Sequence, residues 1–142
     1  MFENPPKQQI EALLRRARTV AVLGLSDTPG RPSHNVARAL QKFGYRIVPV
    51  NPAAREILGE RAWPDLGSAI QGVGAVDVVD VFRRPEHVPV IVDEAIRLKV
   101  PALWLQDGVI DEAAAEKARA AGIFTVMNRC MFRDRSSLGD VI

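Results

Sequence analysis

The stretch TVAVLGLSDTPGRPS, Thr19 to Ser33, decides how the rest of the chain is interpreted. Its first five residues are apolar or β-branched, as in a strand buried inside a sheet, and Gly24 follows directly. After a turn with two prolines, Val36, Leu40 and Phe43 repeat at helical spacing. The stretch therefore predicts a buried strand, a tight turn and an amphipathic helix.

The same alternation continues along the chain. The expected strands are the residue ranges 19–23, 45–50, 76–82, 101–105 and 123–127. The expected helices are one around Ile10 that Asn4 caps, one that Ser33 caps and Gly44 ends, one around Ile91, and one that Asp111 caps and Gly122 ends. Between residues 52 and 73, frequent glycine and proline predict irregular chain with at most a short extra strand near 60–62 and a helical turn near Ser68.

Repeated strand, helix and strand units require parallel pairing with right-handed crossovers. We therefore expect an α/β fold of Rossmann type: a doubly wound, three-layer α/β/α domain spanning residues 1–142. Its five main strands are expected in the order 2-1-3-4-5, with a short extra edge strand at most. In such sheets, ligands bind outside the carboxyl ends of the strands where the order reverses, here between the first and third strands.

Composition excludes several classes of function. The 142 residues are 47% hydrophobic and 25% charged, with a net charge of +2, which is typical of a globular domain and too balanced for a general nucleic-acid binder. No apolar run reaches the roughly 18 residues that a membrane span needs, and no leader peptide is recognisable, so we expect a cytoplasmic protein. With one cysteine and no pair of histidines at ligand spacing, no metal site is expected.

The turn after the first strand lacks the glycine pattern of dinucleotide-binding enzymes, and the second strand ends in Asn51 rather than in a carboxylate that could hold a ribose. The helix start at Ser33 still suits an anion. Arg31, Arg55 and the pair Arg83–Arg84 are expected at the same edge of the sheet, where guanidinium groups bind phosphates well. The pattern favours a ligand with more than one phosphate, and the missing carboxylate indicates that its ribose is held differently from that of NAD.

Several motifs, in order, resemble one family. They are G-L-S-x-x-P-x-R-P-S, G-Y-x-I-V-P-V-N-P, E-I-L-G, V-D-V-V-D-V-F-R-R, V-D-E-A-I, L-W-L-Q-x-G-V and M-N-R-C. Together they make the chain similar to the small stand-alone CoA-binding proteins, whose domain is similar to the N-terminal domain of the succinyl-CoA synthetase alpha subunit. The match covers nearly the whole chain after the first helix.

The resemblance implies that coenzyme A lies across the carboxyl edge of the sheet. Its diphosphate is expected near residues 24–33, its adenosine end near 51–55, and its pantetheine past 82–88 toward Gln106. The implied binding residues are Gly24, Leu25, Ser26, Arg31, Ser33, Asn51, Pro52, Arg55, Phe82, Arg83, Arg84, Val88 and Gln106. Relatives often carry lysine after the N-P pair, where this chain has Ala53, so Arg55 is the candidate for the 3′-phosphate.

Two classes of function remain. The first is a module that binds, senses or carries CoA or an acyl-CoA without catalysis; the second is an NAD(P)-dependent oxidoreductase or other nucleotide-dependent enzyme. No catalytic constellation can be assembled from the sequence, and a chain of this length has no room for the second domain of a synthetase, so we expect the binding module. Cys130 is either a buried, inert thiol or a redox thiol able to pair with CoA. Protein partners and self-association are left open by these patterns.

Overall fold

The computed structural model describes residues 1–139. The strands are β1 (Thr19–Leu23), β2 (Arg46–Val50), β3 (Glu56–Ile57), β4 (Glu60–Arg61), β5 (Val78–Val81), β6 (Ala102–Leu105) and β7 (Phe124–Met127). The helices are α1 (Lys7–Arg16), α2 (Pro32–Lys42), α3 (Leu66–Val73), α4 (Val88–Leu98), α5 (Glu112–Ala120) and α6 (Met131–Ser136), with a 3-10 turn over Pro85–His87 before α4.

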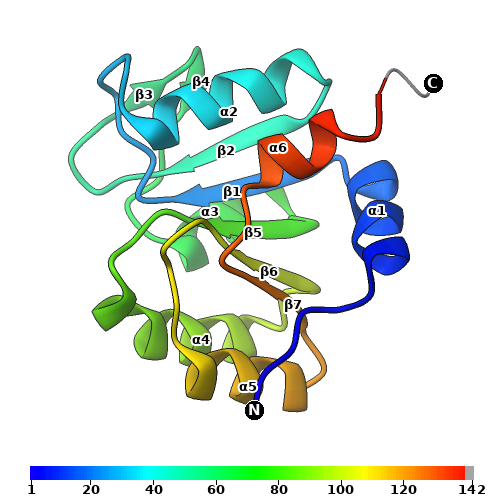
Figure 1. The fold of residues 1–142 in the computed structure, drawn as a ribbon. Helices are drawn as coiled ribbons and strands as arrows, with labels where there is room; N and C mark the ends of the chain where they lie inside the picture. The colour runs from blue at the N-terminus through cyan, green and yellow to red at the C-terminus, as the bar shows by residue number, and fades with distance from the viewer. Residues whose placement is uncertain (140–142) are drawn as a thin grey trace.

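The main sheet has five parallel strands in the order β2-β1-β5-β6-β7. This is the predicted order, because β5, β6 and β7 are the third, fourth and fifth long strands of the chain. The strand order reverses at β1, which has β2 on one side and β5 on the other (Figure 1). The carboxyl ends of β1 and β5 therefore form the switch point at which ligands bind in such sheets.

Helices cover both faces of the sheet, as expected for parallel strands. On one face, α3, α4 and α5 pack on the inward residues of the strands, such as Val79 and Leu103. On the other face, α1, α2 and α6 pack on the alternate residues, such as Val78 and Trp104. Figure 1 shows these two layers with the sheet between them. The fold is the predicted three-layer α/β/α arrangement.

The segment between β2 and β5 is more regular than predicted. β3 and β4 pair with each other as a small antiparallel sheet instead of adding a strand to the edge of the main sheet. The expected helical turn near Ser68 is an eight-residue helix, α3. The Asp65 carboxylate caps this helix by accepting a hydrogen bond of 2.7 Å from the Ser68 amide. The prediction failed here because short elements with many glycines carry little periodic signal.

Two expected helix caps are wrong. The Asn4 side chain does not cap α1; it exchanges hydrogen bonds of 2.8 and 3.0 Å with the backbone of Met127, along the outer edge of β7. Ser33 lies inside the first turn of α2, which begins at Pro32. In both places the polar side chain satisfies a backbone group elsewhere in the fold, which local sequence patterns do not reveal.

α6 follows β7 and was not predicted, because six residues are too few to show helical spacing. Among the described residues, no helix is long and apolar enough to cross a membrane.

Candidate functional site

A cleft of about 780 Å³ lies at the carboxyl ends of β1, β2 and β5. Nine of the thirteen predicted binding residues line it: Gly24, Leu25, Ser26, Arg31, Asn51, Pro52, Phe82, Arg83 and Arg84. The sheet topology brings them together, because the loops after neighbouring parallel strands emerge at the same edge.

Gly24 is required by close packing between two of these loops. Its φ of +77° lies in a region that favours glycine. A Cβ atom placed on Gly24 would lie 2.3 Å from the Phe82 carbonyl oxygen and 2.9 Å from Cδ of Arg83. Glycine at position 24 thus allows the loop after β5 to lie directly against the loop after β1.

The loop from Ser26 to Ser33 is held by its own polar groups. The backbone N–H of Ser26 donates to the Ser33 hydroxyl at 2.9 Å, and the Ser26 carbonyl lies 2.9 Å from Nδ1 of His34. Because a carbonyl only accepts, that ring nitrogen carries the hydrogen. Farther along, the Asn35 side chain bonds both backbone groups of Gly30 at 3.3 Å. The loop is therefore shaped before any ligand arrives.

The start of α2 lies next to the cleft, which Arg31 lines from the N-cap position. No side chain caps the helix, and its first turn contains no acidic residue. Pro32 has no N–H, but the amides of the following residues and the positive end of the helix dipole favour negative charge. Arg31, at the N-cap position and exposed, adds a guanidinium group to this end of the cleft.

The cleft contains charges of both signs. Besides the three arginines Arg31, Arg83 and Arg84, its lining includes the carboxylates of Asp27, Asp65 and Glu94. The hydrogen bond from the Ser68 amide lowers the pKa of Asp65, so this carboxylate stays ionised and serves as the cap of α3. The cleft as a whole is therefore nearly balanced in charge, and its three guanidinium groups are the lining groups suited to bind phosphate.

Four predicted residues do not line the cleft. Val88 is fully buried in the core, and Arg55 is exposed just before β3. Ser33 lies beneath the loop and supports Ser26. Gln106 is only 3% exposed, and its Oε1 accepts a hydrogen bond of 3.0 Å from the Met131 amide, so its side chain holds the start of α6.

Sequence reasoning missed one wall of the cleft, which is formed by Pro64, Asp65, Leu66, His87, Ile91 and Glu94. Trp63 places part of this wall: its amide donates to the Pro49 carbonyl at 2.9 Å, and its carbonyl accepts from Asn51 N–H at 2.8 Å. The Trp63 ring packs on Gly72 of α3, where a Cβ would lie 2.0 Å from the ring. The W-P-D-L stretch, residues 63–66, is the sequence feature that could have indicated this wall, but only tertiary contacts bring it to the cleft.

Asp80 lies in the central strand β5, on the face covered by α2 and α6, between its register partners Val22 and Trp104. Its exposed fraction is 0%, and neither carboxylate oxygen accepts a hydrogen bond of ordinary geometry from a described residue. Burial raises the pKa of Asp80 well above its usual range, which favours the neutral acid. Asp80 does not line the cleft, so its role in this arrangement is in the core.

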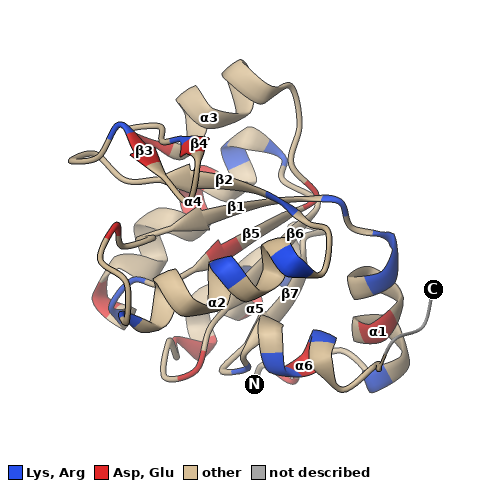
Figure 2. Ribbon diagram, turned by 90° about the horizontal axis from the view of Figure 1, so that it is seen from above, with Lys and Arg blue, Asp and Glu red and all other residues tan. Residues whose placement is uncertain are grey.

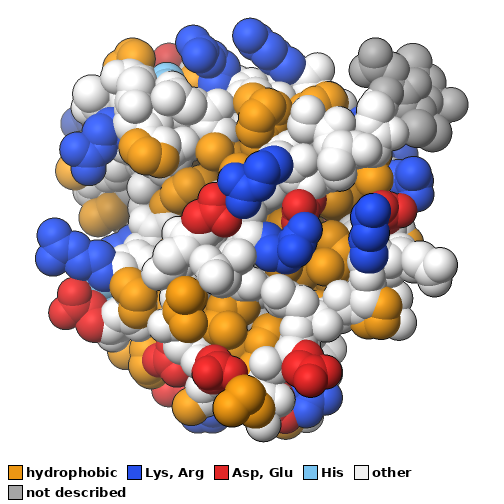
Figure 3. Space-filling model, in the orientation of Figure 1, with side chains coloured by type: hydrophobic (Ala, Val, Ile, Leu, Met, Phe, Trp, Pro, Cys, Tyr) orange, Lys and Arg blue, Asp and Glu red, His pale blue; other side chains and the backbone are white. Residues whose placement is uncertain are grey.

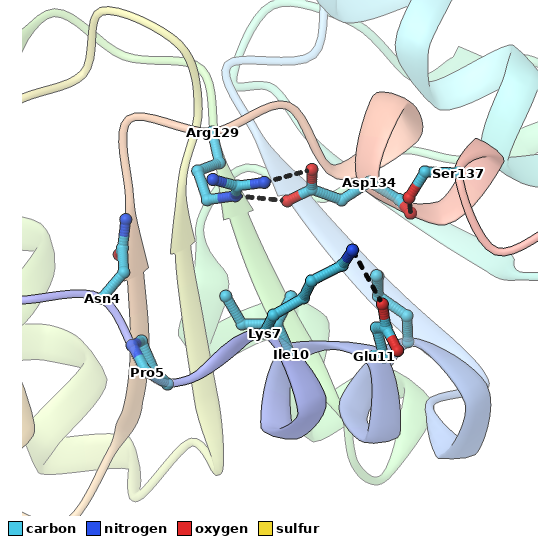
Figure 4. Close-up of a pocket in the computed structure, with 9 residues that line it drawn as sticks. Asn4, Pro5, Lys7, Ile10, Glu11, Arg129, Asp134 and Ser137 are labelled. Carbon is cyan, nitrogen blue, oxygen red and sulfur yellow. Dashed lines mark hydrogen bonds and ion pairs between the residues drawn. The ribbon is translucent and has the colours of Figure 1, made fainter.

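Cys130 is 7% exposed at the N-cap of α6 and does not line the cleft. Beside it, Arg129 forms a two-point ion pair with Asp134, with N···O distances of 2.6 and 2.8 Å. This pair borders a separate small pocket of about 170 Å³ between α1 and α6, shown in Figure 4. There Lys7 likewise lies 3.9 Å from Glu11, so each basic group of this small pocket has an acidic neighbour.

Comparison with known proteins agrees with the fold. The chain is 39% identical over 130 residues to the uncharacterized protein YneT of Bacillus subtilis, covering 92% of this chain and 94% of YneT. A solved structure from Thermus thermophilus, cell-free ID.343, is 37% identical with a TM-score of 0.86, covering 94% of this chain and 99% of that one.

A larger protein contains a related segment. The ADP-forming acetate–CoA ligase I of Archaeoglobus fulgidus is 29% identical over 102 residues, covering 72% of this chain but only 14% of the ligase. The family described as CoA binding domain matches residues 18–135, which is most of the chain and includes the whole cleft. The chain belongs to this CoA-binding domain family.

Proposed function

We propose that the protein binds coenzyme A or an acyl-CoA in the cleft at the carboxyl ends of β1, β2 and β5. The observation that carries the proposal is the meeting of an uncapped helix start with Arg31, Arg83 and Arg84 in one cleft of about 780 Å³. This is a site for a ligand with several phosphates attached to a larger body.

Within the cleft, the diphosphate in this proposal binds near Ser26 and Arg31, beside the start of α2. The pantetheine arm then runs along Phe82 toward Leu66 and Ile91, the apolar part of the lining. This path differs from the one expected toward Gln106, whose side chain is occupied by the Met131 amide. The neutral amides of pantetheine suit a wall that carries both apolar groups and carboxylates.

The protein acts in this proposal as a single-domain cytoplasmic module that binds, senses or carries the ligand, without catalysis of its own. The alternative is an NAD(P)-dependent oxidoreductase or another nucleotide-dependent enzyme. The residue after β2 separates the two, because Asn51 has no carboxylate for a ribose and both its amide groups already bond to the backbone.

Thermal unfolding in the presence of CoA, acetyl-CoA, NAD, NADP and ATP at equal concentrations tests the proposal. A ligand at 100 times its dissociation constant adds about 2.7 kcal/mol to the free energy of unfolding, which raises the midpoint by several degrees. We expect CoA or acetyl-CoA to give the largest increase. A larger increase of the unfolding midpoint with NAD or NADP than with CoA would overturn the proposal in favour of an NAD(P)-dependent oxidoreductase.

A further inference from the structure

A second sizeable pocket lies at the opposite end of the sheet, where β1 and β2 begin. Its volume is about 480 Å³, and its lining is Leu14, Arg15, Ala17, Arg18, Phe43, Gly44, Tyr45 and Arg135. The connection from α1 to β1, the start of β2 and α6 meet here, and Figure 2 shows basic residues along that connection and at the start of β2. No residue of the CoA cleft takes part in this pocket.

Two of the three arginines are held in place by the backbone and by an aromatic ring. Arg18 donates through Nη1 to the carbonyls of Arg15 and Ala17, at 2.9 and 3.1 Å. The Arg135 guanidinium lies 4.5 Å from the centre of the Phe43 ring and donates through Nη1 to the Gly139 carbonyl at 3.4 Å. The hydrogen bonds of each guanidinium use only Nη1, so further N–H donors remain on both groups.

The two arginines line one pocket together with the Tyr45 phenol, although they come from opposite ends of the chain. The Tyr45 hydroxyl donates to the Leu14 carbonyl, which fixes its position. Burial raises the pKa of Tyr45, and the positive charges of Arg135 and then Arg18 act in the opposite direction. Arg18 and Arg135 line the same pocket as Tyr45, so two positive charges share one small volume, an arrangement that costs electrostatic free energy unless an anion joins it.

Among residues 1–139, neither Arg18 nor Arg135 forms an ion pair, and Arg15 has only a 4.0 Å contact with Glu11. At this end of the sheet, the carboxylate of Asp77 accepts hydrogen bonds of 2.8 and 2.9 Å from the backbone amides of Arg18 and Thr19. The neighbouring small pocket, which shares Leu14, is different because its basic groups face carboxylates. On the face shown in Figure 3, basic and acidic side chains alternate over α1 and α6.

We propose that the pocket formed by Arg15, Arg18, Tyr45 and Arg135 is a second anion site, which takes a small molecule bearing a phosphate or polyphosphate group. Guanidinium forks match phosphate oxygens in two-point hydrogen bonds, and Tyr45 adds a polar wall. The volume accommodates a phosphorylated molecule of modest size rather than a long chain. The site does not depend on CoA binding in the cleft.

Titration of the isotopically labelled full chain with inorganic pyrophosphate, at about 0.15 M salt to screen surface charge, tests this site. We expect the backbone amide resonances of Arg18, Gly44 and Tyr45 to shift and to saturate. Arg18→Gln and, separately, Arg135→Gln should each weaken this binding about tenfold, the size of a lost charge-assisted hydrogen bond. The dispersion of the same spectra reports whether each variant remains folded.

Two controls separate the site from general charge and from the cleft. Arg38→Gln removes one exposed positive charge from α2 and should leave the affinity within about twofold. Arg31→Ala alters the cleft and should leave the shifts at Gly44 and Tyr45 unchanged. The proposal is overturned by shifts that do not saturate, by shifts confined to the cleft, or by equal losses in Arg38→Gln and Arg18→Gln.

Discussion

The side-chain amide of Asn51 donates a hydrogen bond of 2.9 Å to the carbonyl of Leu25. Asn51 follows β2 and Leu25 follows β1, so this bond joins the two loops that form adjacent walls of the cleft. Oδ1 of the same side chain accepts hydrogen bonds of 2.7 and 3.2 Å from the backbone amides of Ala53 and Ala54. One side chain thus shapes the loop after β2 and fixes it to the loop after β1.

Of the substitutions Asn51→Ala and Asn51→Asp, one should lower the stability more and the other should weaken CoA binding more. Asn51→Asp keeps the two bonds accepted by Oδ1 but loses the bond to Leu25, whereas Asn51→Ala loses all three. We expect Asn51→Ala to lower the free energy of unfolding more, by about 1 to 3 kcal/mol in urea titrations. Asn51→Asp should weaken CoA binding more in calorimetry, because it adds negative charge near the phosphates. The same order in both measurements would contradict the placement of phosphate at this end.

Gly24 and Gly30 form a matched pair that separates backbone conformation from close packing. Both have positive φ, but a Cβ at Gly24 meets the Phe82 carbonyl, whereas a Cβ at Gly30 has nothing within 4 Å. Gly30→Ala should cost about 1 kcal/mol of unfolding free energy, and Gly24→Ala about 3 kcal/mol because overpacking is added. Equal losses in denaturant titrations would show that the loops can separate without cost.

Substitutions of Arg31 and Arg55 should differ in whether the loss of affinity depends on the 3′-phosphate of CoA. Arg31 lies in the cleft beside the start of α2, so Arg31→Ala should weaken CoA and dephospho-CoA alike, by about 1.5 to 3 kcal/mol in calorimetry. If Arg55 replaces the lysine of relatives, Arg55→Ala should weaken CoA and spare dephospho-CoA. Arg55 is exposed outside the cleft lining, so its contact requires the adenosine end to extend over β3. Equal losses for both ligands in Arg55→Ala would assign the 3′-phosphate to another group.

Asp80 should make the fold less stable as the pH rises. Its pKa is raised in the folded state, so above the ordinary value of 3.8 the folded protein holds a proton that the unfolded chain releases. Stability is then lost with increasing pH by up to about 1.4 kcal/mol per unit, until the folded group itself ionises. In urea titrations from pH 5 to 8, the unfolding free energy of Asp80→Asn minus that of the original protein should increase. A difference independent of pH would mean that Asp80 is ionised in the fold.

The sequence by itself determined the order of the five main strands and the edge at which they end. Continuous apolar runs such as Thr19–Leu23 require burial on both faces, and connections of helical length force parallel pairing. These are local properties of the chain, which do not depend on distant contacts. They are enough to place Gly24, Asn51 and Arg83 at one edge of the sheet.

Only the tertiary structure decided which of the expected residues reach the cleft. Ser33, Val88 and Gln106 have the right position along the chain, but burial or a backbone partner occupies each of them. The wall around Asp65 and Ile91 arises because Trp63 bonds to β2 and packs on Gly72. The pocket at Tyr45 likewise needs Arg18 and Arg135 to meet. Such contacts join residues far apart in the chain, so their free energy depends on packing geometry that local patterns do not contain.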